Sequence, residues 1–256
     1  MTLTASGPEE VIKRLKIKEQ RITFNLNDIS KSQLDDLASK TVESNSDVVS
    51  FFVPDQWKQI NIPILSDMPI EIDDAQAKGL RIDFIRYSHL PLNAPIPISL
   101  FFPPQNLQNF NPSNVQISPS DSIKVMDSVP LINARLFATG VDSLFLDTVK
   151  DMIEVVIIVA ERPDRTLLDW SVQFVNPRQL EDRYVTALMS DVSDNDIRLM
   201  QPILREEYLR NRFRSYMNHF QLYESEDNKL DFSIFLKDRQ IYINKGNALS
   251  SSTAVR

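Results

Sequence analysis

The sequence has no cysteine in its 256 residues, which excludes disulfide bonds, a thiol nucleophile and a thiolate metal site. It has only four glycines, all far apart, so it contains neither a Walker loop nor a GxGxxG phosphate cradle. The longest unbroken apolar run, Val155–Ala160, is far shorter than the roughly 20 residues of a membrane-spanning helix. We therefore expect no transmembrane segment.

Histidine is also scarce, and the two that occur, His89 and His219, accompany no HExxH or GxSxG motif. The densest acidic set, Glu71 with Asp73 and Asp74, fits a solvated surface better than a metal centre. We therefore predict no catalytic residue, no metal ligand and no cofactor. The sequence favours a non-enzymatic protein and leaves an unrecognised small enzyme as an alternative.

The charge is acidic overall but unevenly distributed. The net charge of −7 disfavours non-specific adhesion of the whole surface to nucleic acid or to anionic membrane. Residues 198–214, however, carry five arginines and only two glutamates. Residues 1–10 have neither the positive charge nor the apolar stretch of a secretory signal, so we expect a cytosolic, non-secreted protein.

Between residues 48 and 175 the apolar pattern is mainly that of strands. Eleven of the 15 prolines fall between Pro54 and Pro130, where they mark strand ends and turns. The stretch 103–122 is rich in Pro, Asn, Gln and Ser and is expected to be a long surface loop or a mobile insertion. The expected strands are Val48–Val53, Gln59–Leu65, Leu80–Tyr87, Ile96–Phe102, Ile123–Val125, Pro130–Phe137, Ile153–Val159 and Leu167–Val175.

Many short strands with Pro-rich connections favour a mainly β (α+β) fold, with an antiparallel β-sandwich or jelly-roll-like core and helical N- and C-terminal segments. A helix is expected over Asp196–Phe220, followed by a hairpin of Leu230–Leu236 and Gln240–Ile243 around Lys237-Asp238-Arg239. We expect four parts: an N-terminal segment at 1–47, the core at 48–176, the helix and hairpin packed on it at 177–246, and a flexible tail at 247–256.

The expected helix 196–220 carries the most suggestive pattern. Three of its arginines recur every seven residues, and guanidinium groups suit phosphate or carboxylate. Interleaved Tyr208, Phe213 and Tyr216 offer surface on which single-stranded bases could stack. The alternative is an amphipathic helix with its aromatics in the core and its arginines paired with acidic residues.

A second basic helix is expected at the N-terminus, from a capping box at Ser6–Glu9 to about Lys18. The candidate nucleic-acid-binding residues of the two helices are Arg198, Arg205, Arg210, Arg212, Arg214, Lys13, Arg14, Lys16 and Lys18.

Three stretches resemble plant-virus movement proteins of the 30K superfamily. Gly79–Tyr87 and Ile96–Leu100 are similar to paired strands of that family, and Asp127–Leu131 is similar to its later β segment. The resemblance covers roughly residues 60–175, and no functional residue is carried over. It implies a jelly-roll-like fold, binding of single-stranded nucleic acid, self-association and action at plasmodesmata.

The leading hypothesis is therefore a viral movement protein for cell-to-cell transport, located in the host cytoplasm, at plasmodesmata or at the cell periphery. Its expected partners are single-stranded nucleic acid, further copies of itself and other viral proteins. A viral capsid or matrix subunit is the alternative.

Overall fold

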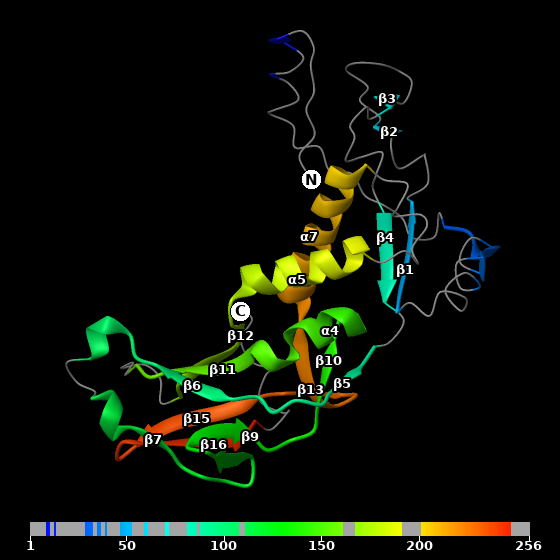
Figure 1. Cartoon of the computed structure of the whole chain (residues 1–256). Helices are drawn as coiled ribbons and strands as arrows, with labels where there is room; N and C mark the ends of the chain where they lie inside the picture. Colours follow the sequence, from blue (N-terminus) through cyan, green and yellow to red (C-terminus); the bar gives the residue numbers. More distant parts are fainter. Residues whose placement is uncertain are drawn as a thin grey trace. The chain divides into compact units, whose positions relative to one another are not determined.

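A computed structural model describes most of residues 88–246 and shorter parts of the chain before them (Figure 1). The described residues are 9–10, 13, 29–32, 35–36, 39, 47–52, 59–60, 70–71, 81–85, 88–107, 111–160, 167–190 and 201–246. The chain forms two compact units, residues 1–86 with 189–208 and residues 87–188 with 209–256. The predicted tail and most of the predicted N-terminal segment lie outside the described residues, and the four-part division stays a prediction.

The first unit contains two short antiparallel pairs. Strand β1 (Val48–Phe52) pairs with β4 (Arg81–Ile85), with Val48 opposite Ile85. Strand β2 (Gln59–Ile60) pairs with β3 (Ile70–Glu71). Strands therefore occur within three of the stretches whose apolar pattern predicted them.

The second unit holds most of the described elements. Its strands are β5 (Leu90–Leu92), β6 (Ile98–Phe101), β7 (Gln116–Ile117), β8 (Ile123–Met126), β9 (Val129–Ile132), β10 (Leu136–Thr139), β11 (Ile153–Ile158), β12 (Asp169–Phe174), β13 (Gln221–Ser225), β14 (Asn228–Lys229), β15 (Phe232–Lys237) and β16 (Gln240–Lys245). Its helices include α4 (Ser143–Val149) and most of α5 (Pro177–Ser190), and α7 (Pro202–His219) is divided between the two units after Tyr208. The fold is mainly β with several antiparallel sheets, as predicted.

Eight strands of this unit form one hydrogen-bonded array. The bridge Pro97–Leu131 links β6 to β9, and the bridge Leu167–Phe235 links β12 to β15. The order is therefore β8-β9-β6-β11-β12-β15-β16-β7, in which β6–β11 and β7–β16 are parallel pairs. Figure 1 shows β15, β16 and β7 side by side below β6 and β11.

Alternation along these strands separates a buried face from an exposed one. On β15 and β16, Ile234, Ile241 and Ile243 are almost fully buried, while their neighbours in the sequence are partly or fully exposed. Trp170 on β12 continues the buried face, because its Nε1–H donates to the carbonyl of Phe232 at 3.1 Å and its ring meets the Phe232 ring edge-on. Period-two alternation thus positions both the core and the outer surface.

A second sheet, in the order β14-β13-β10-β5, lies near the helices. Gly140 follows β10 with a φ of +73°, a conformation that favours glycine, and a Cβ there would lie 3.3 Å from the carbonyl oxygen of His219. The helices, with β12 and the residue after α7, contribute an aromatic cluster in which Phe145 of α4 contacts several rings. The other rings of this cluster are Phe174, Tyr184, Phe213, Tyr216 and Phe220.

The structure corrects several expected elements. The predicted strand Pro130–Phe137 is two strands, β9 and β10, that belong to different sheets. The predicted loop 103–122 includes two 3-10 turns and strand β7, which pairs with β16. Helices α4 and α5 and the strands β5, β13 and β14 were not predicted. The β15–β16 hairpin is confirmed, with a two-residue turn because Lys237 pairs with Gln240.

Candidate nucleic-acid interface

Helix α7 places its predicted arginines in very different environments. Arg205, in the first unit, and Arg212, in the second, are only 9% and 8% exposed, which leaves them little surface to offer a ligand. Phe213 is completely buried and Tyr216 nearly so, so they form core and no stacking platform. Tyr208 donates from its hydroxyl to Asp83 of β4 within the first unit.

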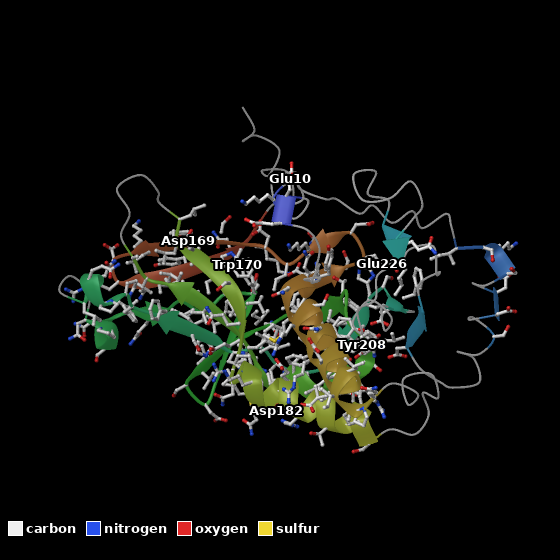
Figure 2. All side chains as sticks on the ribbon, turned by 90° about the horizontal axis from the view of Figure 1, so that it is seen from above. Glu10, Asp169, Trp170, Asp182, Tyr208 and Glu226 are labelled. Carbon is white, nitrogen blue, oxygen red and sulfur yellow. The ribbon has the colours of Figure 1, made fainter. Side chains whose placement is uncertain are left out.

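Arg210 and Arg214 lie on α7 opposite the first turns of α5. Arg214 binds Glu181 with two hydrogen bonds, Nε to Oε2 at 3.0 Å and Nη2 to Oε1 at 2.9 Å. Arg210 bridges Glu181 and Asp182 through Nη1, at 2.9 and 2.8 Å (Figure 2 labels Asp182). Burial alone would raise the pKa of the Glu181 carboxyl, but hydrogen bonds and charge from the two arginines lower it.

A buried carboxylate lies beside the aromatic cluster. Asp142 caps α4 by accepting a 2.6 Å hydrogen bond from the Phe145 N–H, and it accepts a second, 2.8 Å bond from the Tyr184 hydroxyl. Burial raises the pKa of Asp142, and these hydrogen bonds and the positive charge of Arg212 offset only part of that rise. The pKa of Tyr184 is also raised, first by burial and then by the Asp142 charge. The arrangement joins three helices, which is a structural role.

The N-terminal candidates are mostly undescribed. Lys13 is exposed and forms a 2.7 Å ion pair with Glu9, an i,i+4 pair of the kind that stabilises a helix by a few tenths of a kcal/mol. Arg14, Lys16, Lys18 and Arg198 lie outside the described residues. Nucleic-acid binding by the predicted basic residues stays a prediction.

A different surface combines exposed cations with aromatic rings. On the outer face of the β15–β16 hairpin, Phe235 and Tyr242 are directly opposite and stack, with ring centroids 5.2 Å apart and planes within 14°. Lys237 lies two residues from Phe235 on the same face, and Arg239 is in the turn. Both cations are exposed, and neither forms an ion pair with any residue that the structure describes.

This surface was not predicted from the sequence, in which Lys237-Asp238-Arg239 indicates only a turn. Phe235 and Lys237 are two positions apart and therefore lie on the same face of a strand, and the hairpin places Tyr242 opposite Phe235. This spacing was the signal that could have predicted the surface.

The described histidines have local partners. His219 ends α7, where its Nδ1 lies 2.8 Å from the carbonyl oxygen of Ser215. His89 lies just before β5 and meets the ring of Tyr223 edge-on. Within the described part of the chain, no three His, Asp or Glu residues are grouped as metal ligands, and no helix is long and apolar enough to cross a membrane.

The segments that resemble movement proteins fall into both units. The described part of Gly79–Tyr87 is β4, which pairs with β1, whereas Ile96–Leu100 includes β6, which pairs with β11. A comparison with known proteins finds no matching family model, no similar curated protein and no similar solved structure.

Proposed function

We propose that the chain is a non-enzymatic, viral-type protein that binds single-stranded nucleic acid, as a movement protein does in cell-to-cell transport. The supporting observation is the outer face of the β15–β16 hairpin, where the stacked Phe235–Tyr242 pair adjoins Lys237 and Arg239. Proteins that bind single strands without sequence preference combine stacking rings with cations that follow the backbone. Every base has a π-face, so such a surface suits a protein that transports nucleic acid of any sequence.

We propose that the β15–β16 hairpin, and not α7, binds the nucleic acid. Arg210 and Arg214 already have carboxylate partners within their unit, and a phosphate would have to displace those partners. Lys237 and Arg239 carry their charge at an exposed turn, where a phosphate meets no competing ion pair among the described residues. A local cationic site can bind an anion although the net charge of the chain is −7. Salt screens the repulsion between the anion and acidic groups that lie further away than about one Debye length.

A jelly-roll-like core, self-association and location at plasmodesmata or the cell periphery belong to the same proposal. The antiparallel pairing of β11 with β12 and of β15 with β16 supports such a core. The parallel pairs β6–β11 and β7–β16 depart from the antiparallel pairing of such a core.

The test is binding of labelled single-stranded RNA to the purified full chain across a salt series, by fluorescence anisotropy. We expect binding that weakens steeply with salt. Replacing Lys237 and Arg239 by Gln should weaken it and reduce the slope of log K against log salt by about 1.4, because each neutralised phosphate contributes about 0.7 for single strands. The control is the double variant Lys124→Gln, Lys229→Gln, which removes the same charge from exposed positions on β8 and β14. Absence of binding at low salt would contradict the proposal.

A capsid or matrix subunit is a second candidate, and one observation favours it. The tip of the β8–β9 hairpin exposes Val125, Met126 and Val129 at 46%, 50% and 43%. Clustered exposed apolar residues are typical of protein–protein contact. Formation of closed particles by the purified chain, without RNA binding, would favour this candidate.

A further inference from the structure

We propose that the bound strand lies across the sheet, from the stacked pair on β15 and β16 to Phe101 on β6, which acts as a second stacking position. This inference rests on the proposed function and specifies the path of the same ligand.

The register places apolar side chains of five neighbouring strands on one face. Phe235 is directly opposite Tyr242 on β16 and, on its other side, opposite Leu167, which lies two residues before β12. On β11, Ile158 is opposite Asp169 of β12 and therefore diagonal to Leu167, and Phe101 is opposite Ile158. Directly opposite and diagonal side chains on one face are within reach of each other. The path is thus continuous from Tyr242 to Phe101.

Exposure distinguishes this face from the core. Phe101 and Leu167 are 50% and 49% exposed, and Phe235, Tyr242 and Ile158 are half-buried. Their sequence neighbours on the opposite face, such as Ile157, Ile234 and Ile241, are fully buried. A half-exposed ring that is held by a strand can receive a base at low cost in conformational entropy, since its rotamer is already restricted.

The charges around the path indicate on which side the phosphates lie. Lys237 is on the side of the path toward the turn, next to Phe235 and opposite Gln240. Asp169 (labelled in Figure 2) follows Leu167 on the same face, away from that turn and directly opposite Ile158. Glu154 lies further from the turn on the same face, where it accepts a 2.6 Å hydrogen bond from Ser99. We infer that the phosphates follow the side of Lys237 and that the bases lie over the rings.

The minimum length of the bound strand follows from the spacing between neighbouring β-strands. Four steps between neighbouring strands, each about 4.8 Å, separate β16 from β6 by about 19 Å along the sheet. A dinucleotide can occupy the Phe235–Tyr242 pair but is too short to cover the whole path. A site of about four nucleotides or more, as in other β-sheet binders of single strands, is expected.

The test uses uridine oligomers of two and eight nucleotides with the full chain and its variant Phe101→Leu. Loss of one stacked base should weaken binding of the octamer by about fivefold or more and leave binding of the dimer unchanged. The matched control is Phe84→Leu, the same change at a partly exposed position of β4 in the first unit, which should affect neither oligomer. Circular dichroism confirms that each variant is folded.

Three results overturn the inference, and they differ in what they leave intact. If Phe101→Leu binds the octamer as tightly as the wild type does, Phe101 is not part of the path. The proposed function is unaffected by that result, because the wild type still binds the octamer. An equal loss in Phe84→Leu also overturns it, because the effect would then not be specific to this face. Failure of the wild-type chain to bind the octamer at low salt contradicts both the path and the proposed function.

Discussion

Asp142 shows how one buried residue connects elements that are far apart in the sequence. Its carboxylate caps α4, accepts a hydrogen bond from Tyr184 of α5 and faces the charge of Arg212 on α7. A buried charge is tolerated only when hydrogen bonds and opposite charge replace its hydration. The raised pKa of Asp142 indicates that the replacement is incomplete. Compared with the unfolded chain, the folded protein therefore favours the neutral form of this side chain.

Replacing Asp142 should accordingly depend on what replaces it. Asp142→Ala removes the cap and leaves Tyr184 and Arg212 without this partner, so it should lower the free energy of unfolding by about 3 kcal/mol. Asp142→Asn retains a capping oxygen and should cost about 1 kcal/mol or less. Urea denaturation of both variants at pH 7 measures the difference. Equal losses in the two variants would contradict this account.

The pH dependence gives a second measurement on the same pair of proteins. The pKa of Asp142 in the folded state is above its ordinary value of 3.8, so the folded state retains the proton at a pH where the unfolded state has lost it. This contribution to stability is fully present below pH 3.8 and is lost as the pH rises through the folded-state pKa. The stability of the wild type relative to Asp142→Asn should therefore fall as the pH increases over this range. A difference that grows with pH would have the wrong sign.

At the scale of elements, two hairpins have tight turns without glycine. Asp127 and Ser128 join β8 to β9 with φ values of 49° and 68°, and Asp238 and Arg239 join β15 to β16 with 50° and 65°. Two consecutive residues of positive φ are typical of a type I′ turn, which matches the twist of a hairpin but favours Asn and Gly. Both turns therefore have a small conformational cost. In the second turn Asp238 and Arg239 share this cost, and Arg239 is a proposed ligand of phosphate.

Ser128→Gly should relieve this cost and raise the free energy of unfolding by up to about 1 kcal/mol. The control is Ser215→Gly, the same change at an exposed position inside α7, where glycine should destabilise the protein by about 0.5 kcal/mol, since serine is itself a weaker helix former than alanine. Thermal denaturation of the two variants tests the pair. The explanation fails if Ser128→Gly lowers the stability as much as Ser215→Gly does.

At the scale of the whole molecule, the second unit buries two apolar clusters, each built from both of its chain segments. The strand array contains Ile157, Ile234 and Ile241, and the helices contain the aromatic cluster around Phe145. Strand β11 follows α4 after a single 3-10 turn, Lys150–Met152, and Phe174 of β12 contacts Phe145 of α4. The two clusters are therefore connected through β11 and β12. We expect them to unfold together.

Ile234→Ala should test this cooperativity. Truncating a fully buried isoleucine costs about 2–5 kcal/mol. Hydrogen exchange should then accelerate in β11, β15 and β16 and equally in α4, while β1 and β4 of the first unit keep their wild-type rates. Exchange that accelerates in the array alone would show that the helical cluster is a separate cooperative unit.

Much of the secondary structure could be predicted because it follows from local periodicity. The apolar run in Ile153–Val159 predicted β11, and the alternation in Leu167–Val175 predicted β12. The helical spacing of Leu209, Phe213 and Tyr216 predicted α7. Short elements were missed: the seven residues of α4 and the two of β7 are too few for a period to emerge, and their partners lie elsewhere in the chain. The single predicted strand Pro130–Phe137 failed because its apolar run hides a break at Asn133–Arg135.

The amino-acid sequence by itself determined the mainly β class, the absence of thiol chemistry and the positions of the cations and rings. Only the tertiary structure decided which of them face solvent. Arg210 and Arg214 of α7 bind Glu181 and Asp182 on α5 because packing brings together residues that are about 30 positions apart, and Arg205 and Arg212 are buried. Phe101, Phe235 and Tyr242 share one face because strand register, which depends on partners distant in the sequence, aligns them. Periodicity specifies a residue's side of its own strand or helix, and pairing between distant segments specifies its neighbours.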